Sequence, residues 1–224
     1  MNLKVIYPVS EKSSRFCELD PSQLRQRLES KPWDSQTIRL NLVSTKAGLF
    51  AGPNGSSREI SNDVDRVALL SYRRVCDVII TSAKTARLEG YARSKFATLV
   101  VLSRDGNVAG IPAFDSESVG KPAILWQMSD GQLDIRAEAK RNGWNRVLLE
   151  TGPTLSRSLI SECQIDSLML TISDAGSTDP KLACDAALSV IGASNASLLW
   201  AEVVSGTLLT EWDLSGCGVA RLPQ

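Results

Sequence analysis

The chain has 224 residues, of which 43% are hydrophobic and 22% charged, and this suits one globular domain with an ordinary core. Its 25 Lys and Arg residues balance its 25 Asp and Glu residues, so the charge gives no reason to expect nucleic acid or an anionic membrane as partner. The absence of histidine excludes His-based triads, His-ligated zinc and the usual neutral-pH proton shuttle. Any chemistry must therefore come from carboxylates, hydroxyls, Lys, Arg or a cofactor, and we expect no metal.

The five cysteines are odd in number, scattered and without a Cys-x-x-Cys pair. Buried free thiols in a reducing compartment are the economical interpretation. No apolar run reaches the length of a signal peptide or a membrane span. We therefore expect a cytoplasmic protein.

The first third of the chain alternates strand and helix patterns. Residues 3–9 suit a short strand or an extended arm. A helix is expected over residues 21–30, with Asp20 as its N-cap. Residues 37–44 alternate as in a strand buried mainly on one side, and a second helix follows with Ser61 as its N-cap.

Continuous apolar runs in the middle of the chain predict central strands that are covered on both faces. These runs are residues 77–81, 98–103 and 122–128. A helix is expected over residues 132–141, ended by Asn142-Gly143. The least structured connections are expected at residues 105–121 and 173–185.

A strand, a glycine turn and a helix follow one another over residues 146–163. Gly152 makes the turn, and Pro153 suits the first helical position, where its missing N–H costs nothing. Such a turn presents free backbone N–H groups and the positive end of a helix dipole, which suits a phosphate, although any strand-to-helix unit needs a turn of this kind.

The chain ends in three further strand patterns, over residues 167–172, 198–205 and 207–214. Ser205-Gly206 indicates that the last two form a hairpin. Strands that alternate with helices predict an α/β fold with a mostly parallel central sheet flanked by helices. The C-terminal hairpin would add antiparallel edge strands.

Five collinear blocks resemble the pyrimidine reductase of bacterial riboflavin biosynthesis, a relative of dihydrofolate reductase. The blocks are RLNLVSTKAG (39–48), GSSREISNDVDR (55–66), DVIITSAKTARLEGY (77–91), LVVLSR (99–104) and ETGPTL (150–155). The last is similar to the family's E-G-G-P-T-L. The resemblance implies a single reductase-like domain over residues 1–224 with the dihydrofolate reductase-like fold, in which residues 1–36 form an arm and a helix.

The resemblance also implies an activity: reduction of a phosphorylated ribosylamino-pyrimidine, 5-amino-6-(5-phosphoribosylamino)uracil, with hydride from NADPH. It implies catalytic or site-closing carboxylates at Glu89 and Glu150. The substrate-binding positions that it implies are Asn41, Ser57 and Arg73. The cofactor-binding positions that it implies are Thr85, Ser103, Arg104, Gly152, Pro153, Thr154 and Leu155.

A homodimer is also implied, with the C-terminal hairpin as candidate interface because Trp200, Trp212 and Leu208 could cover its edge. One departure matters for activity: Ala47 stands where the family has an S-x-D-G aspartate. This leaves open a relative that binds a nucleotide without carrying out the reduction. The shared fold also leaves open a pterin or dihydrofolate reductase.

Overall fold

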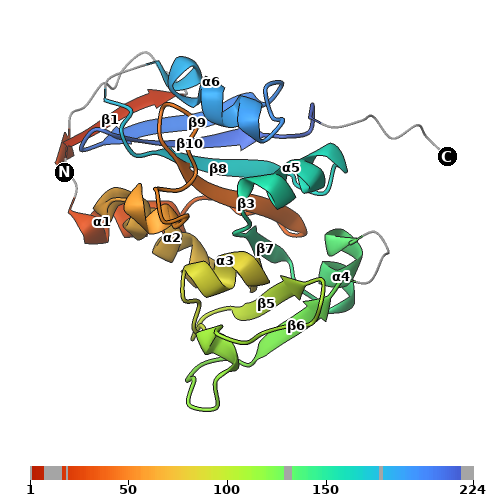
Figure 1. Ribbon diagram of the computed structural model, residues 1–224. Helices are drawn as coiled ribbons and strands as arrows, with labels where there is room; N and C mark the ends of the chain where they lie inside the picture. Colours follow the sequence, from red (N-terminus) through yellow and green to blue (C-terminus); the bar gives the residue numbers. More distant parts are fainter. Residues whose placement is uncertain (1, 8–16, 19, 129–132, 177–178, 218–224) are drawn as a thin grey trace.

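The computed structural model describes residues 2–7, 17–18, 20–128, 133–176 and 179–217 (Figure 1). Its strands form one ten-stranded sheet in the order β2-β1-β9-β10-β8-β3-β7-β4-β5-β6. The strands are β1 (Asn2–Tyr7), β2 (Cys17–Glu18), β3 (Thr37–Ser44), β4 (Val78–Ser82), β5 (Thr98–Ser103), β6 (Ala123–Gln127), β7 (Arg146–Leu149), β8 (Ser167–Ile172), β9 (Ser197–Val204) and β10 (Thr207–Asp213). The helices are α1 (Pro21–Glu29), α2 (Asp63–Val75), α3 (Ala83–Leu88), α4 (Ile135–Arg141), α5 (Pro153–Ser161) and α6 (Pro180–Val190), with short 3-10 turns η1 (Ser57–Glu59) and η2 (Pro112–Phe114).

The centre of the sheet is parallel, from β8 through β3, β7, β4 and β5 to β6. The hairpin of β9 and β10 joins this parallel part in antiparallel fashion through β8. The α/β fold with a mostly parallel core and a C-terminal antiparallel hairpin is therefore confirmed. The carboxyl ends of neighbouring parallel strands meet at one edge, which is where open α/β sheets bind ligands.

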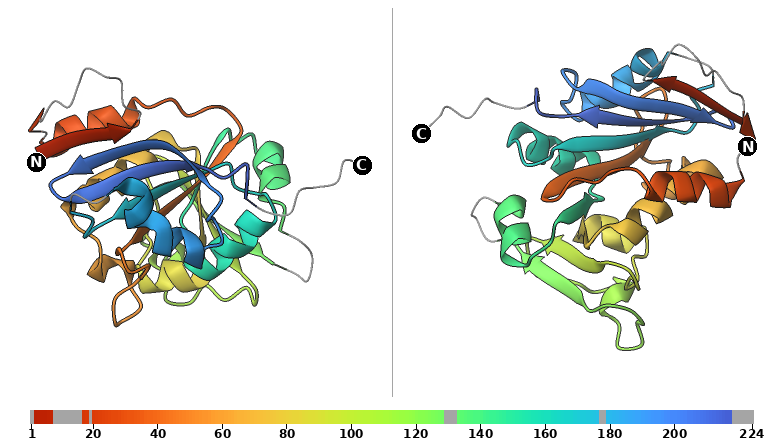
Figure 2. Two further views of the ribbon diagram at one scale, coloured as in Figure 1. Left: turned by 90° about the horizontal axis from the view of Figure 1, so that it is seen from above. Right: turned by 180° about the vertical axis from the view of Figure 1, so that it is seen from behind.

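Helices cover both faces of the sheet (Figures 1 and 2). On one face α4, α5 and α6 bury side chains such as Ile135, Leu159 and Ala187 against alternate residues of the central strands. On the other face α1, α2 and α3 do the same with side chains such as Leu24 and Ala68. Figure 1 shows α1 beside α2, below the β9–β10 hairpin.

Helix starts follow local capping chemistry. Asp20 caps α1, and Gln23 returns a hydrogen bond to complete a capping box, as expected for that start. The expected cap of α2 is wrong by one residue. Asn62 caps the helix by accepting from the backbone N–H groups of Val64 and Asp65, both at 3.1 Å, whereas Ser61 donates its hydroxyl proton to the Asp65 carboxylate.

Three expectations about burial and connections are also wrong. β3 is buried on both faces, because it lies in the middle of the sheet, where other elements cover both faces (Figure 1). β6 is only partly buried, because it is an outer strand of the described sheet. Residues 173–185, expected to be irregular, include the start of α6, whose buried face consists largely of small residues and gives a weak apolar pattern.

The C-terminal hairpin is not an edge of the sheet, because β9 pairs with β1 on its other side. Trp212 and Leu208 are buried within the sheet's own core, and half-buried Trp200 packs against Lys31, so none of the three covers an exposed edge. The reason for placing a dimer interface there is therefore wrong, and the homodimer itself stays a prediction that light scattering can check.

The described cysteines fit the expected free thiols: Cys76, Cys184 and Cys217 are buried and Cys163 is partly buried. Within the described part of the chain, none of the helices has the length and apolar character needed to span a membrane.

Candidate active site

A groove of about 590 Å³ lies between α2 and residues 89–96, the segment that follows α3. Ile79 of β4 and Leu99 of β5 contribute its apolar lining from the sheet, and Val67 and Leu70 contribute it from α2. Seven cationic side chains line the groove: Arg25, Arg58, Arg66, Arg73, Arg74, Arg93 and Lys95. Glu89 is the one acidic residue among the described lining residues. In a chain with no net charge, this concentration of positive charge favours an anionic ligand.

Glu150 is held behind this groove by two of its lining residues. The carboxylate is 5% exposed and accepts from Arg73 Nε at 2.9 and 3.2 Å. The Tyr91 hydroxyl donates to the same carboxylate, and the Arg73 guanidinium lies 4.6 Å from the centre of the Tyr91 ring. Thr81 Oγ1 fixes the backbone here by donating to the Glu150 carbonyl oxygen at 2.6 Å.

The electrostatics keep both donors protonated. Burial and the neighbouring Glu150 carboxylate raise the pKa of Tyr91 well above its ordinary value. Burial alone would lower the pKa of Arg73, but the charge and hydrogen bonds of Glu150, together with the interaction with Tyr91, outweigh burial and raise this pKa. The Arg73 cation and the neutral Tyr91 hydroxyl therefore both present hydrogens to Glu150 at neutral pH.

Asp65 is a second buried carboxyl group near the groove, and the sequence analysis missed it. It is 4% exposed and accepts from Ser61 Oγ at 2.5 Å and from the side chain of Thr171 on β8. Burial raises the pKa of Asp65; these two hydrogen bonds oppose the rise, and the nearby Glu150 charge adds to it. Ser61 itself lines the groove, so Asp65 is one hydrogen bond away from the groove wall.

The sequence contains a pattern that could have identified Asp65 as a buried acid. Asp65, Ala68 and Tyr72 stand at positions i, i+3 and i+7 of α2 and are all buried. An acid on the apolar stripe of a helix is costly unless its environment satisfies it, and such groups gather at functional sites.

The raised pKa of Asp65 predicts a pH-dependent stability. The folded state holds the Asp65 proton more tightly than the unfolded state, whose aspartate pKa is about 3.9. The stabilisation by that proton is present below this value and is lost as pH rises through the folded pKa. Asp65→Asn should therefore gain stability relative to the unsubstituted protein as pH rises above about 4, by about 1.4 kcal/mol for each unit of pKa elevation. Urea unfolding at a series of pH values measures this, and a difference that does not change with pH would contradict it.

Glu89 forms a separate cluster at the start of the groove. Its Oε1 accepts from the Ser57 backbone N–H at 2.7 Å and from the Ser57 hydroxyl at 3.1 Å. Ser56 Oγ also donates to the carboxylate, and Arg58 Nε lies 3.4 Å from Oε2. The structure thus brings together two pairs of the expected site residues: Ser57 with Glu89, and Arg73 with Glu150.

The glycine turn before α5 has the expected form. Gly152 is the N-cap, it offers no side-chain cap, and Pro153 occupies the first turn. A Cβ added at Gly152 would have Thr85 Oγ1 of α3 as its nearest neighbour, at 3.8 Å. Thr85 and Gly152 therefore face each other across space that a Cβ would enter without a clash, and Thr154 and Leu155 follow in the same helical turn.

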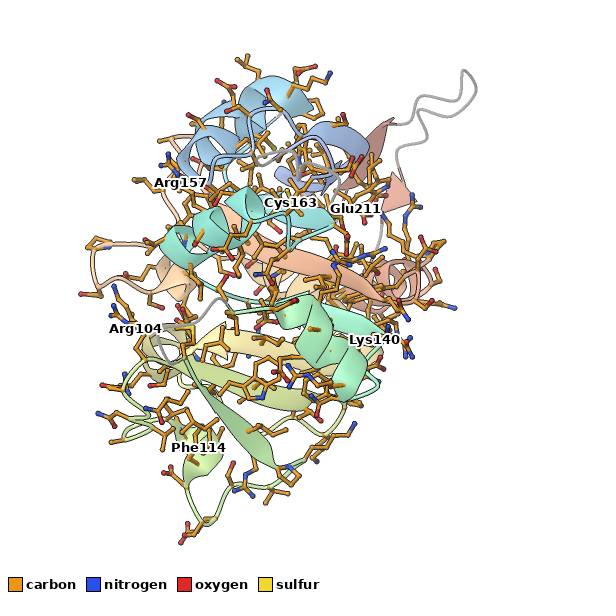
Figure 3. The ribbon with its side chains drawn as sticks, turned by 90° about the vertical axis from the view of Figure 1, so that its right-hand side faces the viewer. Arg104, Phe114, Lys140, Arg157, Cys163 and Glu211 are labelled. Carbon is orange, nitrogen blue, oxygen red and sulfur yellow. The ribbon has the colours of Figure 1, made fainter. Side chains whose placement is uncertain are left out.

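The other expected cofactor residues lie at the end of β5. Ser103 is buried and donates to Asp105 Oδ1 at 2.8 Å. Arg104 lies at the surface beyond the strand, on the opposite side of the view from Lys140 (Figure 3). Hydrogen bonds from the Asn107 backbone and from Ser103 lower the pKa of Asp105, so a carboxylate stands beside these two residues.

Asn41 and Ala47 lie away from these clusters in the chain. Asn41 is half-buried in the middle of β3, opposite Met169 of β8. Ala47 is exposed in the turn after β3, and Asp174 accepts from the Lys46 backbone N–H in that turn at 2.7 Å.

No family model and no curated protein sequence matches the chain. Solved structures do resemble it. A pyrimidine reductase-like protein from Corynebacterium diphtheriae has a TM-score of 0.59 at 15% identity, over 85% of this chain and 98% of that one. A diaminohydroxyphosphoribosylaminopyrimidine deaminase/5-amino-6-(5-phosphoribosylamino)uracil reductase from Thermotoga maritima has a TM-score of 0.57 at 15% identity, over 80% of this chain and 56% of that one.

A dihydrofolate reductase from Enterococcus faecalis, solved with NADP(H), has a TM-score of 0.52 at 11% identity over 81% of this chain and 98% of that one. The match spans little more than half the length of the Thermotoga maritima chain. At these identities the comparisons establish the dihydrofolate reductase-like fold.

Proposed function

We propose that this protein is a reductase that uses NADPH to reduce a small phosphorylated heterocycle–sugar, with a ribosylamino-pyrimidine as the first substrate to test. One observation carries the proposal: Glu150 joins the two halves of the site. Its carboxylate is bound by Arg73 and Tyr91 of the cationic groove. Two residues later Gly152 starts α5 in the turn that faces Thr85. A phosphorylated substrate in the groove and a cofactor over this turn would therefore meet at the carboxyl end of β7.

The comparisons support this proposal through the fold. Two of the similar structures carry reductase names that refer to pyrimidines, and a third is a dihydrofolate reductase solved with NADP(H). The five sequence blocks supply the residue-level resemblance, including ETGPTL over residues 150–155.

The residues around the turn fit a dinucleotide cofactor. Gly152 to Leu155 would hold the pyrophosphate with free N–H groups of the first turn of α5, where the helix dipole favours negative charge. Thr85 would contact the cofactor from α3, and Arg104 would pair with a 2′-phosphate. When bound, the nicotinamide supplies the hydride. Because Asp105 places a carboxylate beside Arg104, NADPH and NADH should be compared directly.

The chain's own groups would supply the proton and hold the substrate. Arg58 and Arg66 would bind the phosphate at the α2 N-terminal end of the groove. Asp65, whose pKa burial raises, would in its protonated form donate its O–H to Ser61 Oγ, and Ser61 would pass its own hydroxyl proton to the substrate in the groove. Glu150 would fix the direction of Arg73 and Tyr91 through their shared hydrogen bonds, and Glu89 would fix Ser57 and Arg58.

The test is a titration with NADPH and NADH, followed through nicotinamide fluorescence, and then turnover with the phosphorylated ribosylamino-pyrimidine and with dihydrofolate. Binding followed by oxidation of the cofactor with the pyrimidine supports the proposal. Absence of cofactor binding overturns it. Binding without turnover supports the non-catalytic alternative, which the alanine at position 47 favours, and turnover of dihydrofolate alone supports a pterin reductase.

Gly152→Val gives a sharper test of the cofactor position. The folded protein has room for a Cβ there, and the backbone φ of −66° suits any residue, so we expect the melting temperature to change little. A branched side chain would occupy the space assigned to the pyrophosphate, and NADPH affinity should fall at least tenfold, or by about 1.4 kcal/mol.

Gly216→Ala is the matched control. A Cβ there meets only the Asn195 carbonyl oxygen at 3.5 Å, an ordinary contact distant in sequence from the proposed site. It should leave NADPH affinity unchanged. Unchanged affinity in Gly152→Val as well would remove the cofactor from this turn.

A further inference from the structure

The cations of the groove divide between its two ends. Arg66 and Arg74 both lie on α2, eight residues apart, which at 1.5 Å per residue separates them by roughly 12 Å along the helix axis. Arg58 lies before the N-terminal end of α2 and pairs with Glu89. At the other end, Arg74 lies over the Phe96 ring, and its Nε is 3.0 Å from Glu29 of α1.

Among the residues that the structure describes, each end of the groove has a cation without an acidic partner. Arg66 lies at one end. At the Arg74 end, Arg25 stands one helical turn before Glu29 on α1, and Lys95 directly precedes Phe96. All three line the groove, and within the described residues their side chains take part in no ion pair or hydrogen bond. They come from α2, α1 and the segment after α3, so three separate elements bring free charge to one groove. Arg73 and Arg93, in contrast, are engaged, by Glu150 and by the Ala113 carbonyl oxygen respectively.

The wall between the two ends is largely apolar. Val67 and Leu70 of α2 face the groove, and Leu70 and Phe96 remain 45% and 47% exposed. A single phosphate is too small to contact cations roughly 12 Å apart. Because Arg25 and Lys95 lie at the Arg74 end, a ligand whose one anionic group binds Arg66 would not reach them.

We propose that the groove binds an extended ligand with two anionic groups, one at the Arg66 end and one at the Arg25–Lys95 end, joined by an apolar or planar body. Applied to the reduction, and resting on the function proposed above, this means that the substrate carries a further phosphate or carboxylate beyond its sugar phosphate. The second group would be recognised by charge at a partly exposed site, so its contribution should weaken as salt rises.

The affinities of alkane-diyl bisphosphonates of increasing chain length measure the separation between the two anion-binding ends of the groove. Alkyl monophosphonates of the same length are the controls. Binding is followed by calorimetry at low and at physiological salt, without cofactor. We expect the bisphosphonate that spans about 12 Å to bind at least tenfold more tightly than its monophosphonate. Shorter bisphosphonates should show little of this advantage.

Substitutions at each end of the groove test which cations bind each anionic group of the ligand. Arg25→Gln with Lys95→Gln should remove the advantage of the long bisphosphonate and leave the monophosphonate affinity unchanged, whereas Arg66→Gln should weaken both. Arg157→Gln, an exposed arginine on α5 outside the groove lining, should change neither. Equal affinity for the long bisphosphonate and its monophosphonate, or an advantage that survives Arg25→Gln with Lys95→Gln, would overturn the inference.

The outcome is separable from that of the proposed function. Length-selective binding with no NADPH binding would leave the two-anion groove standing and overturn the reductase. Turnover of the phosphorylated pyrimidine without length selectivity would overturn the two-anion groove alone.

Discussion

Arg73→Met should destabilise the protein by about 3–5 kcal/mol, because it leaves the buried Glu150 carboxylate without its cation. Glu150 is 5% exposed, and Arg73 donates to its carboxylate from both Nε and a terminal guanidinium nitrogen. Tyr91 would remain as a donor, but a neutral hydroxyl does not compensate a buried charge. Urea unfolding monitored by circular dichroism measures the loss.

The neighbouring arginine is the matched control. Arg74 pairs with Glu29 at 3.0 Å, but 41% of its side chain is exposed. Arg74→Met should therefore cost less than about 1 kcal/mol. If Arg73→Met costs no more than Arg74→Met, loss of the Arg73 cation does not leave an unpaired buried charge at Glu150.

A double variant separates the effect of the unpaired charge on stability from the effect of lost packing. Replacing both partners, Arg73→Met with Glu150→Met, removes the unpaired carboxylate and should recover much of the stability lost in Arg73→Met. A double variant as unstable as the sum of the two single variants would show that packing, and not pairing, explains the loss.

The sequence could predict the parts of this fold that depend on local signals. Asp20 with Gln23 at the start of α1, Pro153 after Gly152, and the turn at Ser205-Gly206 all act within a few residues, and each occurs as expected. The runs of branched apolar residues likewise identified the central parallel strands, because strands covered on both faces need such residues at consecutive positions.

What the sequence could not predict depends on partners far along the chain. β1 covers the edge of β9 although the two strands lie at opposite ends of the chain, so the hairpin was expected at an edge that the fold does not leave open. α6 starts from a capping aspartate and a proline, but its small buried side chains give little periodic signal. The groove shows the same limit, since the cations of α1, α2 and the segment after α3 converge only in the folded chain.

The resemblance identified Glu150 and Arg73 separately, with one as a catalytic carboxylate and the other as a substrate contact. The structure places each as the other's partner. A carboxylate that accepts from Arg73 and Tyr91 at once is well suited to positioning both side chains. We therefore propose Asp65, which is hydrogen-bonded to Ser61 of the groove wall, as the proton source in place of Glu150.

Asp65→Asn should therefore lower turnover about a hundredfold or more while leaving NADPH affinity within twofold, because the amide keeps the shape of the carboxyl group but has no acidic proton to transfer. The Ser61 hydroxyl can still donate to the oxygen of the introduced amide, and Asn62 still caps α2, so the start of the helix should persist. Asp63→Asn is the matched control on the same turn of α2. Its side chain is exposed, and its removal should change turnover less than twofold.

The pH profile of turnover distinguishes a proton source from a merely structural acid. Burial raises the pKa of Asp65, so activity of the unsubstituted enzyme should fall as pH rises through that pKa and the proton is lost. Asp65→Asn should have low activity without this decline, whereas Glu89→Gln, which weakens the hold on Ser57, should keep the decline at reduced activity. If Asp65→Asn retains both the activity and the decline, the proton comes from Glu89 or water, and Asp65 serves only to fix Ser61 and Thr171.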